Sequence, residues 1–192
     1  MDIKSLSSNK GNILDGVFIF KPILFEDNRG SFYESWNQSL FNKAVGEEIK
    51  FLQDNHSISN IGVLRGLHYQ IEPKPQGKLV RCVSGSVFDV AVDIRKSSAT
   101  FGEWTSIVLD NINKFMIWIP VGFAHGFLAI EENSEVLYKA SELWSKEQDR
   151  AIRWDDKDIN INWPLKDINF FEPRLSENDS KAPFLKNAEV FH

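Results

Sequence analysis

Polar and apolar residues alternate most clearly between Ser86 and Ile94. Every second residue from Phe88 to Ile94 is apolar and falls on one face of an extended chain, whereas Asp89 and Asp93 fall on the other. Gly85 stands just before this segment and permits a tight turn from the apolar run that precedes it. The pattern predicts a strand over 86–94 that follows a neighbouring strand after a short turn.

Short apolar segments separated by turn residues continue along most of the chain. They predict extended segments at residues 17–25, 31–36, 51–59, 62–70, 78–83, 104–109, 114–119, 122–130 and 135–143, with a turn at 26–30. One short helix is predicted at Gln38–Val45, because Gly46 stands just past its end. The tail after Trp154 is loop-like, contains three prolines and is expected to wrap around the strands.

Many short strands at roughly even spacing indicate an all-β, mainly antiparallel fold, which would be a sandwich, a jelly roll or a barrel. No strand–helix–strand unit is visible, so a parallel sheet is not expected. The 192 residues contain no repeat, linker or low-complexity tract that would divide them. We therefore expect one domain over residues 1–192.

The composition is that of a soluble globular protein, with 42% hydrophobic and 26% charged residues. The formal net charge of −5 argues against a nucleic-acid-binding protein, which usually carries a basic surface. The same charge leaves room for a phosphate-bearing small molecule, since a few Arg and Lys side chains can form a local positive pocket.

Three further features bear on the cell compartment. Residues 1–10 are polar and lack the apolar core of a signal peptide. The longest apolar stretch, Phe115–Ala124, contains Pro120 and is too short to span a bilayer. The single cysteine, Cys82, lies in an apolar run and is expected to be a buried small hydrophobe, not a nucleophile. We expect a protein of the reducing cytoplasm that does not bind a membrane.

Three of the four histidines, His56, His68 and His125, lie within predicted strands, and each has polar neighbours. Polar groups that are unusual in apolar strands need hydrogen-bond partners or line a wet cavity. A cavity is the favoured interpretation here. His192 is the last residue, and we assign it no role.

Several charged residues lie in or near the same segments: Arg29, Glu34, Arg65, Lys78 and Arg81. A solvated surface position is the ordinary interpretation of any one of them. As a group they could bind a diphosphate, because Arg and Lys donors match phosphate oxygens. We leave Arg81 out of this group, because strand alternation places it and Lys78 on opposite faces.

Seven segments share their sequence and their order with one enzyme family. They are QDNHS (53–57), GVLRGLHYQ (62–70), QGKLVR (76–81), VFDVAVD (87–93), TFG (100–102), WIPVGFAHGF (118–127) and VLYK (136–139). The series resembles the dTDP-4-dehydrorhamnose 3,5-epimerases, a cupin-type family of sugar-nucleotide enzymes. One such motif would be weak, but seven in register, between Val17 and Leu185, are specific.

The resemblance implies a cupin-like jelly roll or β-sandwich with a few short peripheral helices, and a homodimer that exchanges its N-terminal strands. It also implies a dTDP-linked 4-keto-6-deoxyhexose as substrate, inverted at the carbons on both sides of the ketone. Hydrogens on those carbons are acidic because the carbonyl group can hold the electron pair as an enolate, so no cofactor or metal is expected. The product would enter dTDP-rhamnose synthesis for bacterial cell-envelope or O-antigen polysaccharide.

By the same resemblance, His68 is the base that removes a proton, and an imidazole suits this work because it titrates near neutral pH. Asp179 orients the histidine and steadies its charged form. Tyr138 is the acid on the opposite face. Lys78 lies near the carbonyl oxygen and stabilises the developing negative charge. His125 assists there or binds the sugar.

The nucleotide-binding residues implied by the family are Arg29, Glu34, Gln53, Asn55 and Arg65. Glu34 would accept the thymine ring N–H, and the arginines would hold the diphosphate. Arg29 and Glu34 are expected to come from the partner subunit of the dimer.

The chain departs from the family's usual pattern around the sugar pocket. Where the family often has a Tyr-Tyr pair followed by Pro and Glu, this chain has Leu143-Trp144, Lys146 and Asp149. Asn178 stands where a Lys often precedes the orienting aspartate. We still assign Trp144 and Asp149 to substrate binding. The exact sugar and the stereochemical outcome stay open.

Strict alternation would place Arg65 and His68 on opposite faces of the strand 62–70. Both residues can reach one pocket only if Gly66 marks a bulge or bend, which is a usual role of glycine within a strand. We therefore predict an irregularity at Gly66, and regular pleating there would remove Arg65 from the pocket.

Three other functions compete with the double epimerase. Pro120-x-Gly122-x-x-His125 resembles half of a cupin metal motif, but the other half, which should supply two further histidines and a glutamate, is missing around His68. A second rival is a 3-epimerase or a 3,4-ketoisomerase that acts on a related 4-keto sugar. The third is a non-catalytic sugar-nucleotide-binding module, because a fold does not dictate a function.

Overall fold

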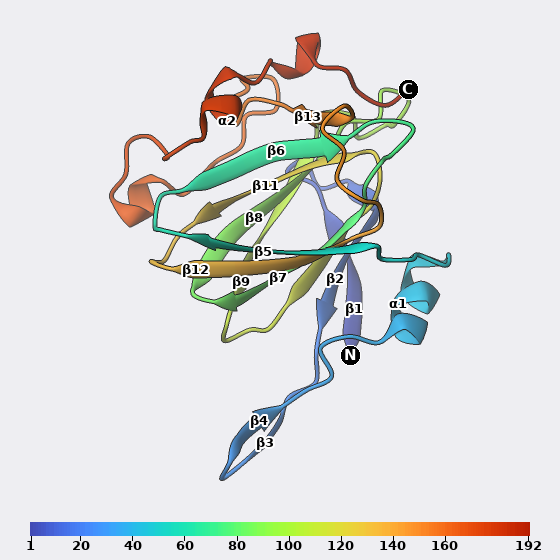
Figure 1. Cartoon of the computed structure of the whole chain (residues 1–192), viewed down its shortest axis with the longest axis vertical. Coiled ribbons are helices and arrows are strands. Elements are labelled where there is room, and N and C mark those ends of the chain that lie inside the picture. Colours follow the sequence, from blue (N-terminus) through green and yellow to red (C-terminus); the bar gives the residue numbers. More distant parts are fainter.

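Two antiparallel sheets form the body of the protein, for which a computed structural model describes residues 1–192 (Figure 1). The first sheet has the order β1 (Asp2–Ser7), β2 (Ile13–Lys21), β10 (Met116–Ile119), β7 (Lys78–Ser84), β12 (Ser134–Ala140) and β5 (Gln53–Ser59). The second has the order β13 (Asp149–Ala151), β6 (Leu64–Gln70), β11 (Phe123–Ala129), β8 (Ser86–Asp93) and β9 (Trp104–Asp110). The predicted all-β sandwich is confirmed.

The main core lies between the two sheets. Its buried members come from β2, β7, β10 and β12 on one side and from β8, β9 and β11 on the other. Strand β8 has the predicted alternation, because Val87 and Ala91 belong to this core while Val90 and Val92 pack on the opposite face. Cys82 is buried within the same core, as predicted.

The C-terminal tail covers the outer face of the five-stranded sheet. Ile152, Ile159, Leu185 and Val190 pack there against apolar residues of β6, β8 and β11, and the orange and red tail lies over β6 in Figure 1. The buried carboxylate of Asp156 accepts hydrogen bonds from three backbone N–H groups of the tail. This covering explains why β8 is buried on both faces, and it brings helix α2 (Glu177–Lys181) next to β6.

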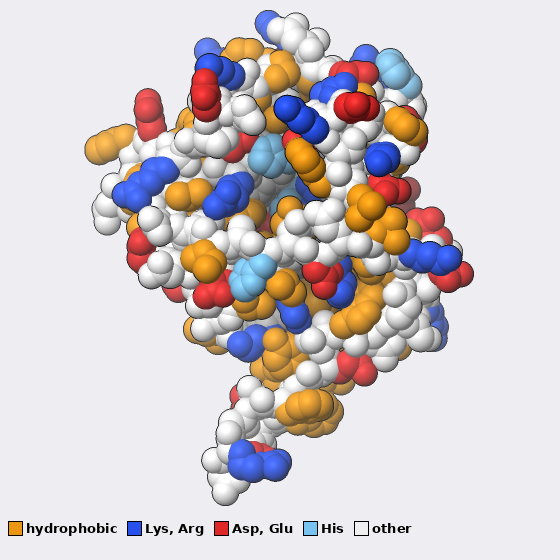
Figure 2. Space-filling model, viewed as in Figure 1, with side chains coloured by type: hydrophobic (Ala, Val, Ile, Leu, Met, Phe, Trp, Pro, Cys, Tyr) orange, Lys and Arg blue, Asp and Glu red, His pale blue; other side chains and the backbone are white.

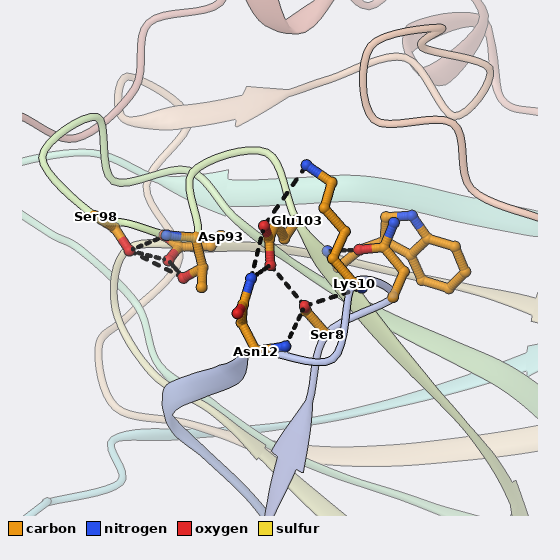
Figure 3. Close-up of polar contacts among 9 residues, drawn as sticks. Ser8, Lys10, Asn12, Asp93, Ser98 and Glu103 are labelled. Carbon is orange, nitrogen blue, oxygen red and sulfur yellow. Dashed lines mark hydrogen bonds and ion pairs between the residues drawn. The ribbon is translucent and has the colours of Figure 1, made fainter.

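Polar anchors join the N-terminal strands to the five-stranded sheet (Figure 3). The buried carboxylate of Glu103, just before β9, accepts hydrogen bonds from Ser8 Oγ at 2.6 Å and from Asn12 Nδ2 at 3.0 Å. The β1–β2 turn is thus fixed to the body of its own chain.

A second buried carboxylate lies nearby in the same view. Asp93, at the end of β8, accepts hydrogen bonds from the side chains of Arg95, Ser98 and Thr100, which belong to the segment between β8 and β9.

Helix α1 occupies the predicted bounds, Gln38–Val45, with Gly46 in the left-handed region at its C-terminal end. Asn37 begins it, because its side chain accepts a hydrogen bond from the Leu40 backbone N–H at 3.1 Å. Phe41 packs the helix onto the outer face of the six-stranded sheet, among Phe20, Leu79, Met116 and Trp118. Two short 3₁₀ turns, Lys166–Ile168 and Leu185–Asn187, complete the helical segments.

The predictions for the N-terminal region were partly wrong. Strand β1 was not predicted because it is polar, and β2 starts at Ile13 instead of residue 17. The extended segment predicted at 31–36 is a strand only at β4 (Gly30–Phe32), which pairs with β3 (Phe25–Asp27). This hairpin projects away from the sandwich (Figures 1 and 2), with the Phe25 and Phe32 side chains exposed.

Candidate active site

A cavity of about 290 Å³ lies between the two sheets, and Figure 2 shows a hollow with histidine side chains inside it. Both sheets and the tail contribute to its lining: Ser57, Arg65, His68, Lys78, His125, Phe127, Tyr138, Ser176 and Asp179. His68 and His125 belong to the five-stranded sheet, whereas Lys78 and Tyr138 belong to the six-stranded sheet. All four proposed catalytic residues therefore line one cavity.

An irregularity at Gly66 lets both Arg65 and His68 reach this cavity. His68 is opposite His125 on β11 and Arg65 is opposite Phe127, so β6 has one extra residue in this interval. Gly66 has a φ of 124°, and a Cβ atom there would lie 2.5 Å from the Cα atom of Gly126. Only glycine fits this position, and the predicted bulge is confirmed.

His68 pairs with Asp179 across the cavity wall. The Nε2 atom of His68 lies 2.5 Å from Oδ1 of the aspartate, which is the third residue of α2, and the N-cap of this helix is Ser176. Burial raises the pKa of the Asp179 carboxyl, but hydrogen bonds from His68, Ser176 and the Gly66 backbone, with the charge of His68, outweigh burial and hold that pKa below its usual value. The ionised carboxylate can therefore orient the imidazole and stabilise its protonated form.

Lys78 begins β7 and is buried between the sheets. Its Nζ atom donates a hydrogen bond to the His68 carbonyl oxygen at 3.3 Å and lies 6.0 Å from the centre of the Tyr138 ring. Burial lowers the pKa of Lys78 to about 8, against the opposing charges of Asp149 and Asp89. An ammonium group in this position can stabilise negative charge that develops in the cavity.

Tyr138 projects from β12 on the sheet opposite His68. Burial raises the pKa of its phenol, the charge of Arg65 lowers it, and the charge of Asp149 raises it, with a net rise. The phenol therefore keeps its proton well above neutral pH and is available as a donor.

A second histidine–carboxylate pair lies beside the first. His125 is buried, and its Nε2 atom is 2.8 Å from Oδ2 of Asp89 on β8. Burial raises the pKa of Asp89, while His125 and Lys78 lower it, and burial prevails. The other carboxylate oxygen of Asp89 is buried without a hydrogen-bond partner.

The predicted nucleotide residues on β5 lie on its inner face, at the side of the cavity. Gln53, Asn55 and Ser57 are partly buried there, and the intervening residues are exposed. Gln53 donates a hydrogen bond to Asn55 at 2.8 Å and accepts one from the Trp144 backbone N–H at 2.9 Å. Arg65 is fixed to the same strand, since its Nε donates a hydrogen bond to Ser59 Oγ at 3.1 Å.

Other predicted site residues lie outside the cavity of this single chain. Arg29 is at the tip of the projecting hairpin, 86% exposed and paired with Asp27, and Glu34 follows the hairpin. Trp144 is 56% exposed, and Asp149 is an exposed residue whose charge acts on Lys78 and Tyr138.

The expectation that His56 lines a cavity is wrong. Its side chain lies on the outer face of β5, because it alternates with Asn55 and Ser57, and its Nε2 is 3.0 Å from Glu135 Oε2. Arg81 also faces outward, beside Leu79 and Leu137. Its omission from the predicted site agrees with this position.

Sequence reasoning did not assign Asp89, Ser57 or Ser176 to the site. Asp89 could have been found from the strand alternation, which places it on the inner face together with Ala91. Ser57 is two residues after Asn55 and so shares its face. The spacing Ser176-x-x-Asp179 is a helix N-cap signature that would have predicted the start of α2.

No group of three or more His, Cys, Asp or Glu side chains is arranged to hold a metal ion. No helix has the length and apolar character needed to cross a membrane.

Comparison with known proteins identifies the family. The family model described as dTDP-4-dehydrorhamnose 3,5-epimerase matches residues 12–187. The chain belongs to this family. The dTDP-4-dehydrorhamnose 3,5-epimerase of Shigella flexneri is 54% identical to it over 175 residues, which are 91% of this chain and 94% of the relative.

Solved structures of similar epimerases have the same fold. The rmlC epimerase of Mycobacterium tuberculosis superposes with a TM-score of 0.90 at 38% identity, over 97% of this chain and 90% of the other. The RmlC of Legionella pneumophila, described as a complex with dTDP-4-keto-L-rhamnose, gives 0.87 at 39% identity, over 97% and 94%. The resemblance found in the sequence motifs is thereby confirmed, together with the cupin-like fold.

Proposed function

We propose that the protein is a dTDP-4-dehydrorhamnose 3,5-epimerase, an isomerase that converts dTDP-4-keto-6-deoxyglucose to dTDP-4-dehydro-L-rhamnose. Relatives that carry this name match the chain over nearly their whole length. The observation that carries the proposal for the site is one cavity in which His68 of one sheet, paired with Asp179 of the tail, lies across from Tyr138 of the other sheet.

The reaction needs a base on one face of the sugar and an acid on the other. His68 removes a proton from a carbon next to the ketone, and Asp179 stabilises the imidazolium that forms. The electron pair moves into the carbonyl group, and the Lys78 ammonium stabilises the resulting enolate oxygen. Tyr138 then returns a proton from the opposite face, which inverts the carbon. His68 then gives up the proton it took, and Tyr138 regains one from solvent. The same steps at the second carbon complete the double epimerisation without a cofactor or a metal.

The nucleotide half of the substrate extends from the cavity along β5. Gln53 and Asn55 lie on the inner face of that strand, and the exposed guanidinium of Arg65 is held beside it by Ser59. Arg65 binds the diphosphate, while His125, Trp144 and Asp149 bind at or beside the sugar.

A homodimer completes the site. Arg29 and Glu34 lie on or next to the projecting hairpin and do not line the cavity of their own chain. They therefore act in the site of a second copy. The exposed Phe25 and Phe32 side chains of that hairpin give it an apolar surface suited to burial in a partner. The hairpin is then the exchanged N-terminal element. The free, buried thiol of Cys82 is consistent with a protein that functions in the reducing cytoplasm.

The direct test incubates the protein with dTDP-4-keto-6-deoxyglucose and a rhamnose-forming reductase. We expect dTDP-rhamnose to accumulate only when both proteins are present. No product at any protein concentration, with a reductase shown to be active on authentic dTDP-4-dehydrorhamnose, would overturn the proposal.

Hydrogen–deuterium exchange into the sugar in D₂O distinguishes the double epimerase from the alternative functions. We expect deuterium at both C3 and C5 of the sugar. Incorporation at C3 alone would indicate a 3-epimerase, and a 3,4-ketoisomerase would move the carbonyl group. A non-catalytic binding module would bind the nucleotide sugar and exchange no hydrogen.

A further inference from the structure

Asp89, the partner of His125, has no assigned task in the reaction proposed above. Asp89 is fully buried on β8, and its Oδ2 atom lies 2.8 Å from the Nε2 atom of His125. Its Oδ1 atom is buried without any hydrogen-bond partner. An isolated buried carboxylate is costly, so a role in the site would explain why it is there.

Strand register places this pair directly beside the proposed base. His125 on β11 is opposite His68 on β6, and directly opposed residues of antiparallel strands point to the same face. On the other side of β11, Asp89 is opposite Phe127, two residues from His125 and on the same face. His125 lines the cavity and Asp89 does not, so Asp89 lies behind the imidazole as seen from the substrate.

This arrangement decides which nitrogen of His125 faces the substrate. Nε2 is occupied by the carboxylate, so Nδ1 is the nitrogen that is left for a group in the cavity. An ionised Asp89 accepts a hydrogen bond, which keeps the proton of a neutral imidazole on Nε2. Nδ1 then presents an acceptor lone pair, or a second N–H when the ring is protonated.

The negative charge of Asp89 also acts on Lys78. The two residues form no direct ion pair, and the Lys78 ammonium instead donates to the His68 carbonyl oxygen. Asp149 has the larger effect and Asp89 the smaller: both charges favour the protonated amine, whose pKa burial lowers to about 8. The titratable and charged groups that surround Lys78 in and beside the cavity are Arg65, His68, Asp89, His125, Tyr138, Asp149 and Asp179.

We propose that Asp89 is a positioning residue of the epimerase: it holds His125 with Nδ1 toward the sugar. The inference rests on the proposed function for its effect on turnover. The orientation of His125 stands apart from that function, because it follows from the contact with Asp89 alone.

Asp89→Asn removes the charge and keeps the size of the side chain. We expect kcat to fall about tenfold, less than the ~10²–10³-fold cost of removing a direct donor to an oxyanion, with little change in KM. Because Asp89 acts through His125, the double variant Asp89→Asn/His125→Gln should lose no more activity than His125→Gln alone. Losses that multiply in the double variant would overturn the positioning role.

Asp156→Asn is the matched control, since Asp156 is also a buried aspartate but binds only backbone groups of the tail. It should lower the midpoint of thermal unfolding without lowering kcat. A fall in kcat as large as that of Asp89→Asn would assign the effect to general loosening of the fold.

The wild-type protein offers a measurement that needs no Asp89 variant. Long-range ¹⁵N–¹H correlation spectra, assigned by comparison with His125→Gln, should show the His125 proton on Nε2 in the neutral ring. A proton on Nδ1 would overturn the proposed orientation. Absence of turnover in the wild-type protein would instead count against the proposed function and leave this spectroscopic result unaffected.

Discussion

The two histidine–aspartate pairs at the cavity consist of the same residue types in different surroundings. The His68 side chain is 39% exposed and its partner Asp179 comes from the tail, whereas His125 and Asp89 are 7% and 0% exposed within one sheet. Burial raises the pKa of both carboxyls. His68, Ser176 and the Gly66 backbone favour the ionised form of Asp179, and its pKa is lowered overall. His125 and Lys78 favour the ionised form of Asp89, but burial prevails and its pKa is raised overall.

The balance between burial and the neighbours that favour the ionised form therefore decides the direction of each pKa shift. The first pair combines an exposed imidazole edge with a firmly ionised partner, which suits a base that takes and releases protons. The second is enclosed and only partly satisfied, which suits a fixed element that orients and polarises its neighbours. Substitutions at the two pairs should have unequal consequences, and the following predictions test this.

The largest difference is expected between the two histidines. His68→Asn should lower kcat by about 10²–10⁴-fold, the usual contribution of a general acid or base, and leave dTDP binding nearly intact. His125→Gln, which retains a donor near Asp89, should cost markedly less. Coupled assays and calorimetric titration with dTDP measure both effects.

His56→Asn is the control for the first prediction, because His56 lies on the outer face of β5 beside Glu135. Its activity should equal that of the wild-type protein. Equal losses at His68 and His125 would remove the distinction between base and positioning element.

Asp179→Asn should have the next largest effect. The amide cannot stabilise an imidazolium, and loss of a carboxylate from such a pair costs up to ~10⁴-fold in other enzymes. We expect about 10²-fold here, since the loss should be smaller than that for the base itself. A loss below that of Asp89→Asn would reverse the roles given to the two pairs.

The alkaline side of the pH profile should report Lys78. As its pKa is lowered to about 8, kcat should decline as the pH rises through that value, because the neutral amine no longer stabilises the enolate. Tyr138 does not explain such a limb, since its pKa is raised. Lys78→Arg keeps its charge at high pH and should lack this limb even at reduced activity.

Gly66→Ala tests whether the bulge in β6 holds the first pair in place. The left-handed conformation and the close approach to Gly126 should together destabilise the fold by roughly 1–3 kcal/mol or more. Thermal unfolding should begin at lower temperature, by roughly 2–4 °C for each kcal/mol. Gly11→Ala is the control, because Gly11 has a similar positive φ but open space around it, so it should cost only the backbone strain.

The sequence predicted those parts of the site that depend on local spacing. Alternation gave the faces of β8, and the conflict between Arg65 and His68 located the bulge at Gly66. The contact of His68 with Asp179 joins residues 111 positions apart, and only the family resemblance suggested it. No periodicity reports how a loop-like tail folds back over a sheet.

Other features depended on tertiary context that the pattern does not contain. Strand β1 is polar and is strand only through its pairing with β2. The orientation of His56 was predictable from its alternation with Asn55, but its polar neighbours suggested a cavity instead. Alternation placed Asp89 on the correct face of β8 but did not predict its partner His125, because that contact depends on the neighbouring strand β11.

The smallest expected effect is on the free energy of unfolding, where the Asp179 and Asp89 variants should differ in sign. The Asp179 pKa is lowered in the folded protein, so its ionised form contributes stability above the unfolded-state value of about 3.9, and this is lost as the pH falls through the folded-state pKa. The Asp89 pKa is raised, so its contribution has the opposite sign and is lost as the pH rises. At pH 7, Asp179→Asn should therefore destabilise the fold by about 1 kcal/mol, while Asp89→Asn should be neutral or stabilising. Unfolding at fixed protein concentration from pH 4 to pH 8 should show the deficit of Asp179→Asn shrinking toward low pH. Equal destabilisation by both variants would mean that Asp89 contributes to the stability of the sandwich, contrary to the sign expected from its raised pKa.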